Sequence, residues 1–144
     1  MEVSVVRQRV RDVLRQAKRT DAERREDHRA QSDQAAREYE TFLQRIAVPL
    51  FKQIADVLRA ESYPCEVFTP GGSVRLMSGK GNDDYLEVVL DTKGAAPKLL
   101  GRASHSRGGN VSQTELVLNA TTDISALTEE DLLGFLLSEL EALL

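Results

Sequence analysis

The sequence predicts an α+β protein: a long N-terminal helix, an antiparallel meander of four or five strands and a C-terminal amphipathic helix packed on the sheet. Apolar residues keep a helical spacing to about residue 60, then alternate between Pro- and Gly-rich turns, and finally return to a leucine-rich helical pattern. A chain of 144 residues suits one domain with an appendage. We therefore expect a polar helical arm at residues 1–34 that serves oligomerisation, and a single α+β domain at residues 35–144.

The strongest helical pattern covers residues 35–60. Its apolar residues recur every three or four positions and fall on one side of a helix, with charged residues opposite. Pro49 lies inside this pattern, where a proline removes one backbone hydrogen bond and crowds the preceding turn. Because the apolar pattern continues past Pro49 and the proline falls on the polar side, we predict one helix kinked near Pro49 rather than two helices.

Residues 3–34 are also helical in character, but their apolar face is short. The face has heptad spacing and consists of Val3, Val6, Val10, Val13 and Ala17. The next heptad positions are polar, so this segment is either a straight continuation of the helix at residues 35–60 or a hairpin hinged near residues 31–34. A helix this polar is marginal in water by itself. We therefore expect its valine edge to pack on another chain.

From residue 63 onward the pattern becomes that of short strands. Alternating apolar segments are separated by turns that contain Gly or Pro, such as residues 70–72 and 107–110. The predicted strands cover residues 65–69, 73–78, 85–91, 98–106 and 111–119. Short connections of this kind favour an antiparallel meander with one apolar and one mixed face.

The last helix is predicted from Thr128 onward. Thr128 and Asp131 have the spacing of an N-terminal cap, and acidic residues in the first turn suit the helix dipole. The leucines form one broad face, at positions 132, 133, 136, 137, 140, 143 and 144. Gly134 and Phe135 fall away from these leucines. We expect this second face to be covered by the N-terminal arm of the same or a neighbouring subunit.

Composition and motifs argue against several chemistries. Cys65 is the single cysteine, which excludes an intrachain disulfide and thiolate metal clusters. His28 and His105 do not form a short metal motif, and neither a phosphate-binding loop nor a nucleophile elbow occurs. We expect no catalytic, cofactor-binding or metal-binding residues. No apolar run approaches the ~20 residues of a membrane span, so we expect a cytoplasmic protein without a membrane partner.

These observations favour a non-enzymatic, homo-oligomeric adaptor that binds an unknown protein partner. Its self-association, most simply as a homodimer, is assigned to Val6, Val10 and Val13, with Gly134 and Phe135 as a second contact. A first alternative is nucleic-acid binding, because a basic stripe runs beside the valines: Arg7, Arg11, Arg15 and Lys18. A second alternative is a small apolar ligand held between the sheet and the helices.

Overall fold

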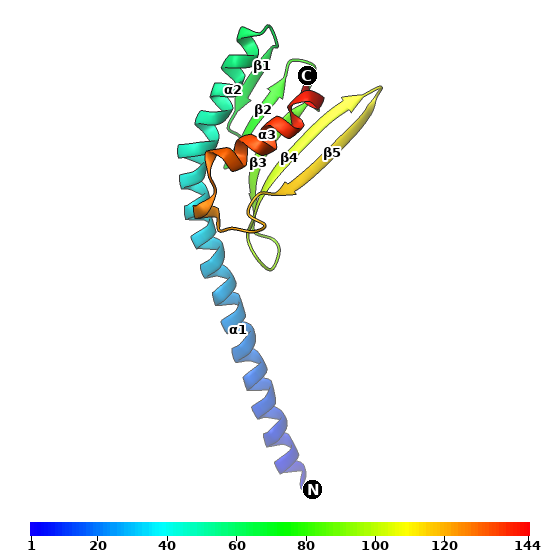
Figure 1. Cartoon of the computed structure of the whole chain (residues 1–144). Coiled ribbons are helices and arrows are strands. Elements are labelled where there is room, and N and C mark those ends of the chain that lie inside the picture. The colour runs from blue at the N-terminus through cyan, green and yellow to red at the C-terminus, as the bar shows by residue number, and fades with distance from the viewer.

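The computed structural model describes all residues 1–144 and confirms the α+β class (Figure 1). The helical elements are α1 (Val3–Phe42), the π-helical turn η1 (Leu43–Ala47), α2 (Val48–Ala60), the 3-10 turn η2 (Ile124–Ala126) and α3 (Glu129–Leu143). The strands are β1 (Cys65–Phe68), β2 (Val74–Ser78), β3 (Tyr85–Asp91), β4 (Lys98–Arg107) and β5 (Asn110–Val117). All five pair antiparallel in chain order, which confirms the predicted meander.

Residues 3–60 form one uninterrupted helical rod, so the hairpin alternative for the N-terminal segment is wrong. At 1.5 Å per residue the rod is about 87 Å long. Its C-terminal half lies beside the sheet, and its N-terminal half projects away from the rest of the molecule (Figure 1). The arm is thus a direct extension of a helix that belongs to the core.

Just before Pro49, near which the sequence predicts a kink, the rod contains the π-helical turn η1. The N–H of Val48 donates to the carbonyl of Leu43, five residues earlier. Pro49 follows directly, at the start of α2, and is exposed. The wide turn therefore ends where the proline lacks an N–H, and the chain continues as one helix.

The π turn also affects which side of the rod faces the sheet. Six of the nine buried residues of the rod recur every four positions: Ala35, Tyr39, Leu43, Ala47, Phe51 and Ala55. Each step of four advances the buried face by about 40° around an α-helix, because successive residues are about 100° apart. The extra residue of a π turn offsets roughly 100° of this drift. Both halves of the rod can therefore face the same sheet.

The core lies between the rod, one face of the sheet and α3 (Figure 1). The register places Val74 opposite Val88 and Leu76 opposite Leu86, and all four side chains are fully buried. The hydroxyl of Tyr39 donates to the carbonyl of Gly72 at 2.6 Å and lies 3.3 Å from that of Val88. This contact ties the last turns of α1 to the sheet.

Helix α3 begins with the predicted cap. The Thr128 side chain accepts from the N–H of Asp131 at 3.2 Å, and the Asp131 carboxylate accepts from the N–H of Thr128 at 2.9 Å. The buried face is rotated from the predicted one, because it includes Phe135 while Leu137 is 57% exposed. Gly101 of β4 explains the rotation, since it leaves room for the Phe135 ring against the sheet.

The opposite face of the sheet carries a row of alternating charges. The register aligns Arg75, Glu87, Arg102 and Glu115 across four strands. Glu87 is only 4% exposed and accepts a 2.6 Å hydrogen bond from Arg75 Nε. Arg102 lies 3.9 Å from Glu87 and 2.9 Å from Glu115. The row binds four strands together on the side that no helix covers.

Candidate interaction surface

The valine seam of the arm, defined as Val3, Val6, Val10, Val13 and Ala17, is exposed along its whole length. Val6, Val10 and Val13 are 44–68% exposed, which is unusual for three valines on one helix face. Leu14 lies beside them and is 55% exposed. Sequence reasoning missed Leu14, although its position next to Val10 and Ala17 on a helical projection places it on the same edge.

The seam and the domain-contacting side of α1 are the same face of one helix. At about 100° per residue, the seam is centred on the same direction as His28, Ala35 and Tyr39. Ala35 and Tyr39 are buried on the domain, and His28 Nε2 lies 3.1 Å from the carbonyl of Gly94 in the β3–β4 connection. The domain therefore covers one end of this face and leaves the valine end open.

The basic stripe runs beside the seam rather than on it. Arg7, Arg11, Arg15 and Lys18 are all exposed, and Arg15 lies 3.5 Å from Asp12 in an ion pair. Exposed pairs of this kind contribute at most about 1 kcal/mol. The stripe is followed by acidic residues from Asp21 onward, which limits a continuous positive track to the first five turns of the rod.

Gly134 and Phe135 do not form a joint surface. Phe135 is buried against β4, so its ring is unavailable for the arm contact assigned to it. Gly134 is exposed, and a Cβ built on it would meet nothing within 4 Å. The arm of the same chain projects away from α3 (Figure 1), so it does not cover Gly134.

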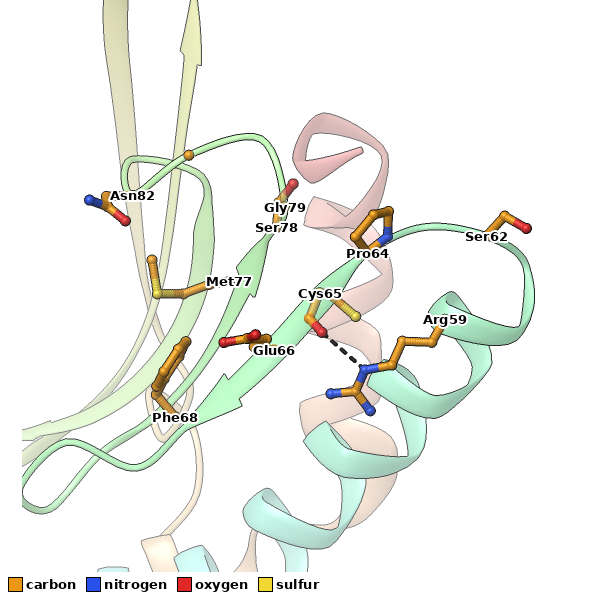
Figure 2. Close-up of a pocket in the computed structure, with 11 residues that line it drawn as sticks. Arg59, Ser62, Pro64, Cys65, Glu66, Phe68, Met77, Ser78, Gly79 and Asn82 are labelled. Carbon is orange, nitrogen blue, oxygen red and sulfur yellow. Dashed lines mark hydrogen bonds between the residues drawn. The ribbon is translucent and has the colours of Figure 1, made fainter.

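A hollow of about 660 Å³ lies where the end of α2 meets the β1–β2 edge of the sheet. Figure 2 shows Arg59 on the helical side and Glu66, Phe68 and Met77 on the strands. Only three of its eleven lining residues are hydrophobic. The hollow is therefore mixed in character and lies at the edge of the sheet, not between the sheet and the helices where the apolar-ligand alternative places its pocket.

Cys65 borders the hollow but is poorly suited to nucleophilic chemistry. Its Sγ donates to the carbonyl of Ala55 at 3.5 Å, and its own carbonyl accepts from Arg59 Nε at 3.0 Å (Figure 2). Burial raises the pKa of the Cys65 thiol, although the nearby Arg59 charge acts in the opposite direction. The thiol is thus held protonated at neutral pH, whereas nucleophilic attack needs the thiolate.

No group of three or more His, Cys, Asp or Glu side chains is arranged to hold a metal ion. None of the helices combines the length and the apolar character that crossing a bilayer requires. Comparisons with protein-family models, with curated proteins and with solved structures found no match. Among the surfaces described, the valine seam is the one whose exposure is hardest to reconcile with an isolated chain.

Proposed function

We propose that this protein is a non-enzymatic, homo-oligomeric adaptor whose arms associate through the valine seam, most simply as a homodimer. The observation that carries the proposal is the exposure of Val6, Val10 and Val13 on a helix otherwise composed mainly of polar residues. The α+β domain then remains free to bind another protein. Gly134 and Phe135 are not part of this proposal, because the first has no neighbour and the second is buried.

Two physical arguments support association through the seam. Burying a valine side chain contributes about 1.5–3 kcal/mol, which an unpartnered arm forgoes. Residues 3–27 also lack tertiary packing that would hold them helical, whereas an isolated helix is marginal in water. A second arm along the seam supplies both the burial and the packing.

The cytoplasm is the compartment that suits this adaptor. Cys65 is a buried free thiol, and free thiols persist in reducing compartments. We propose no membrane partner for this protein.

The direct test replaces Val6, Val10 and Val13 together by Ser and measures molar mass by light scattering over a range of concentrations. The natural chain is expected at about twice its 16.0 kDa, and the triple variant at the monomer mass. Val57→Ser is the matched control, because Val57 is 62% exposed but lies on α2. A natural chain that is monomeric at high concentration, or a triple variant that keeps the larger mass, would overturn the proposal.

A truncation separates the arm from the domain. Removal of residues 1–30 leaves Ala35 and every other buried residue in place. We expect a cooperatively folded monomer whose circular dichroism retains both the sheet and the remaining helices. A truncated chain that still dimerises would place the interface on the domain instead.

Nucleic-acid binding is a second candidate, supported by the exposed basic stripe. It predicts a mobility shift with duplex DNA at low salt whose affinity falls steeply as salt is added, because phosphate contacts release counterions. Joint replacement of Arg7, Arg11 and Arg15 by Ala should abolish the shift, while the valine variant retains it in part. Absence of any shift at low salt would eliminate this candidate.

A further inference from the structure

We infer that the two arms run antiparallel, so that the α+β domains of the dimer lie at opposite ends of a central helix pair. This inference deepens the proposed arm-mediated dimer and rests on it. It follows from the position of the domain relative to the seam, from the fit of the chain ends and from the order of charges along the arm.

The position of the domain leaves no room for a parallel partner helix. The domain lies on the same face of the rod as the seam and begins at the contact between His28 and Gly94. A parallel partner helix would run about 8–10 Å from the rod on that face. Continued in the same direction, it would enter the space that the β3–β4 connection and the sheet already occupy. Two parallel arms would have to separate before residue 28.

The antiparallel arrangement avoids this collision because the second helix ends before it reaches the domain. If Val10 packs opposite Val13 of the second copy, Val6 lies opposite Ala17 and Val3 opposite Thr20. The two-fold axis then passes between residues 11 and 12. Met1 of the second copy lies level with Ala22, six residues or about 9 Å short of His28. The exposed length of seam and the free length of rod therefore match.

The order of charges along the arm also favours the antiparallel pair. Residues 1–19 carry six basic and two acidic side chains, a net charge of +4. Parallel arms in register would place each basic residue level with its own copy. In the antiparallel register the six basic residues lie level with uncharged residues or with an acid: Arg7 with Gln16, Arg9 with Leu14, Arg11 with Asp12, Arg15 with Gln8, Lys18 with Val5 and Arg19 with Ser4.

Placing each basic residue level with a neutral or acidic partner favours the antiparallel pair, because like charges at close range destabilise helix pairs. One like-charged level remains, between Glu2 and Asp21. It falls at the two ends of the overlap, where solvent and salt screen it most effectively.

The test measures the distance between spin labels on the full-length dimer. Glu26→Cys places a nitroxide on the side of the rod opposite the seam, in a Cys65→Ala background that prevents labelling of the native thiol. The antiparallel register predicts a separation of about 50 Å, because the two sites lie 29 residues, or about 44 Å, apart along the axis and about 25 Å apart across it. Parallel arms predict about 25 Å, set by the interaxial distance and the helix radii.

Light scattering on the same labelled sample distinguishes the two possible failures. A dimeric mass with a distance near 25 Å would overturn the antiparallel orientation but leave the arm-mediated dimer intact. A monomeric mass without a measurable distance would overturn both. A dimeric mass with a distance near 50 Å would establish the orientation, provided that the Val6, Val10 and Val13 triple variant loses the distance.

Discussion

The ring of Phe135 lies directly over Gly101: a Cβ added to Gly101 would stand 2.8 Å from the ring carbon Cε1. Residues on α3 and β4, 34 positions apart in the chain, thus determine each other's place in the core. The ring fills the space that the missing side chain leaves, which turns the buried face of α3 toward Phe135 and leaves Leu137 in solvent.

Gly101→Ala is therefore expected to destabilise the fold. The added methyl group overpacks the contact with Phe135, at a cost of about 1–3 kcal/mol in the free energy of unfolding. Urea denaturation measures this change. Gly134→Ala is the matched control, because it meets no neighbour and should stabilise α3 by up to about 1 kcal/mol. Equal effects of the two substitutions would contradict the packing described for Gly101.

Tyr39→Phe should weaken the attachment of α1 to the sheet. The variant loses the hydrogen bond to the carbonyl of Gly72, and a typical intramolecular hydrogen bond contributes about 0.5–1.5 kcal/mol. Chemical denaturation at neutral pH measures the loss. Tyr63→Phe is the control, since Tyr63 is 46% exposed, and it should leave the stability unchanged.

The stability difference between the natural chain and Tyr39→Phe should also depend on pH. Burial, together with the charges of Glu87 and Glu40, raises the pKa of Tyr39 well above the usual value of about 10. Above about pH 10 the unfolded chain releases the phenol proton while the folded chain retains it, so the stability of the natural protein falls as pH rises. The stability difference between the natural chain and Tyr39→Phe should be constant at pH 6–9 and shrink above about pH 10. A difference that grows there would contradict a buried, protonated Tyr39.

Glu87→Gln tests the charged row on the open face of the sheet. Glu87 is buried between Arg75 and Arg102, so loss of its charge should lower the free energy of unfolding by about 1–3 kcal/mol. This destabilisation should persist at high salt, because salt screens buried pairs only weakly. Glu115→Gln removes an exposed partner of Arg102 and should cost at most about 1 kcal/mol, an effect that salt erases. Thermal melts of both variants in low and high salt provide the measurement, and a reversed order of the two effects would refute the role of Glu87.

Deletion of Gln44, an exposed residue of η1, tests the role of the π turn. The deletion restores regular α-helical spacing while the two buried faces stay aligned, but it forces Pro49 into an ordinary helical turn at a cost of about 3 kcal/mol. Adding Pro49→Ala to the deletion should recover most of that loss. Deletion of the exposed Lys52 from α2 rotates the residues that follow by about 100° and should unfold the domain. Similar melting temperatures for the Gln44 and Lys52 deletions would show that the extra residue of η1 is not what keeps the two buried faces of the rod aligned.

Much of the fold could be predicted because local signals agreed with tertiary packing. All five strands occur where glycine and proline turns delimit alternating segments, with ends shifted by at most two residues. The Thr128–Asp131 cap defines the start of α3 through contacts three residues apart. Such features depend on residues that are close together in the sequence, so the sequence pattern predicts them directly.

The features that could not be predicted depend on residues far apart in the chain. Nothing near Phe135 indicates that a glycine on β4 receives its ring, so leucines alone defined the expected face. The π turn is an exception, because it had a local signal: six of the buried residues from Ala35 to Ala55 recur every four positions, a spacing longer than the 3.6 residues of an α-helical turn. The common direction of the valine seam and the domain follows only from the burial of Ala35 and Tyr39 in the folded chain.

The unbroken rod has a mechanical consequence. Because α1 continues into the core without a loop, the segment from Val3 to Gln34, once paired along its seam, is a stiff strut rather than a tether, and it spans about 48 Å. Anything gripped at its tip is held at a set distance and rotational angle from the sheet. Inserting two residues into the strut would lengthen it by about 3 Å but swing the grip through about 200°, so its orientation is far more sensitive to length than its reach.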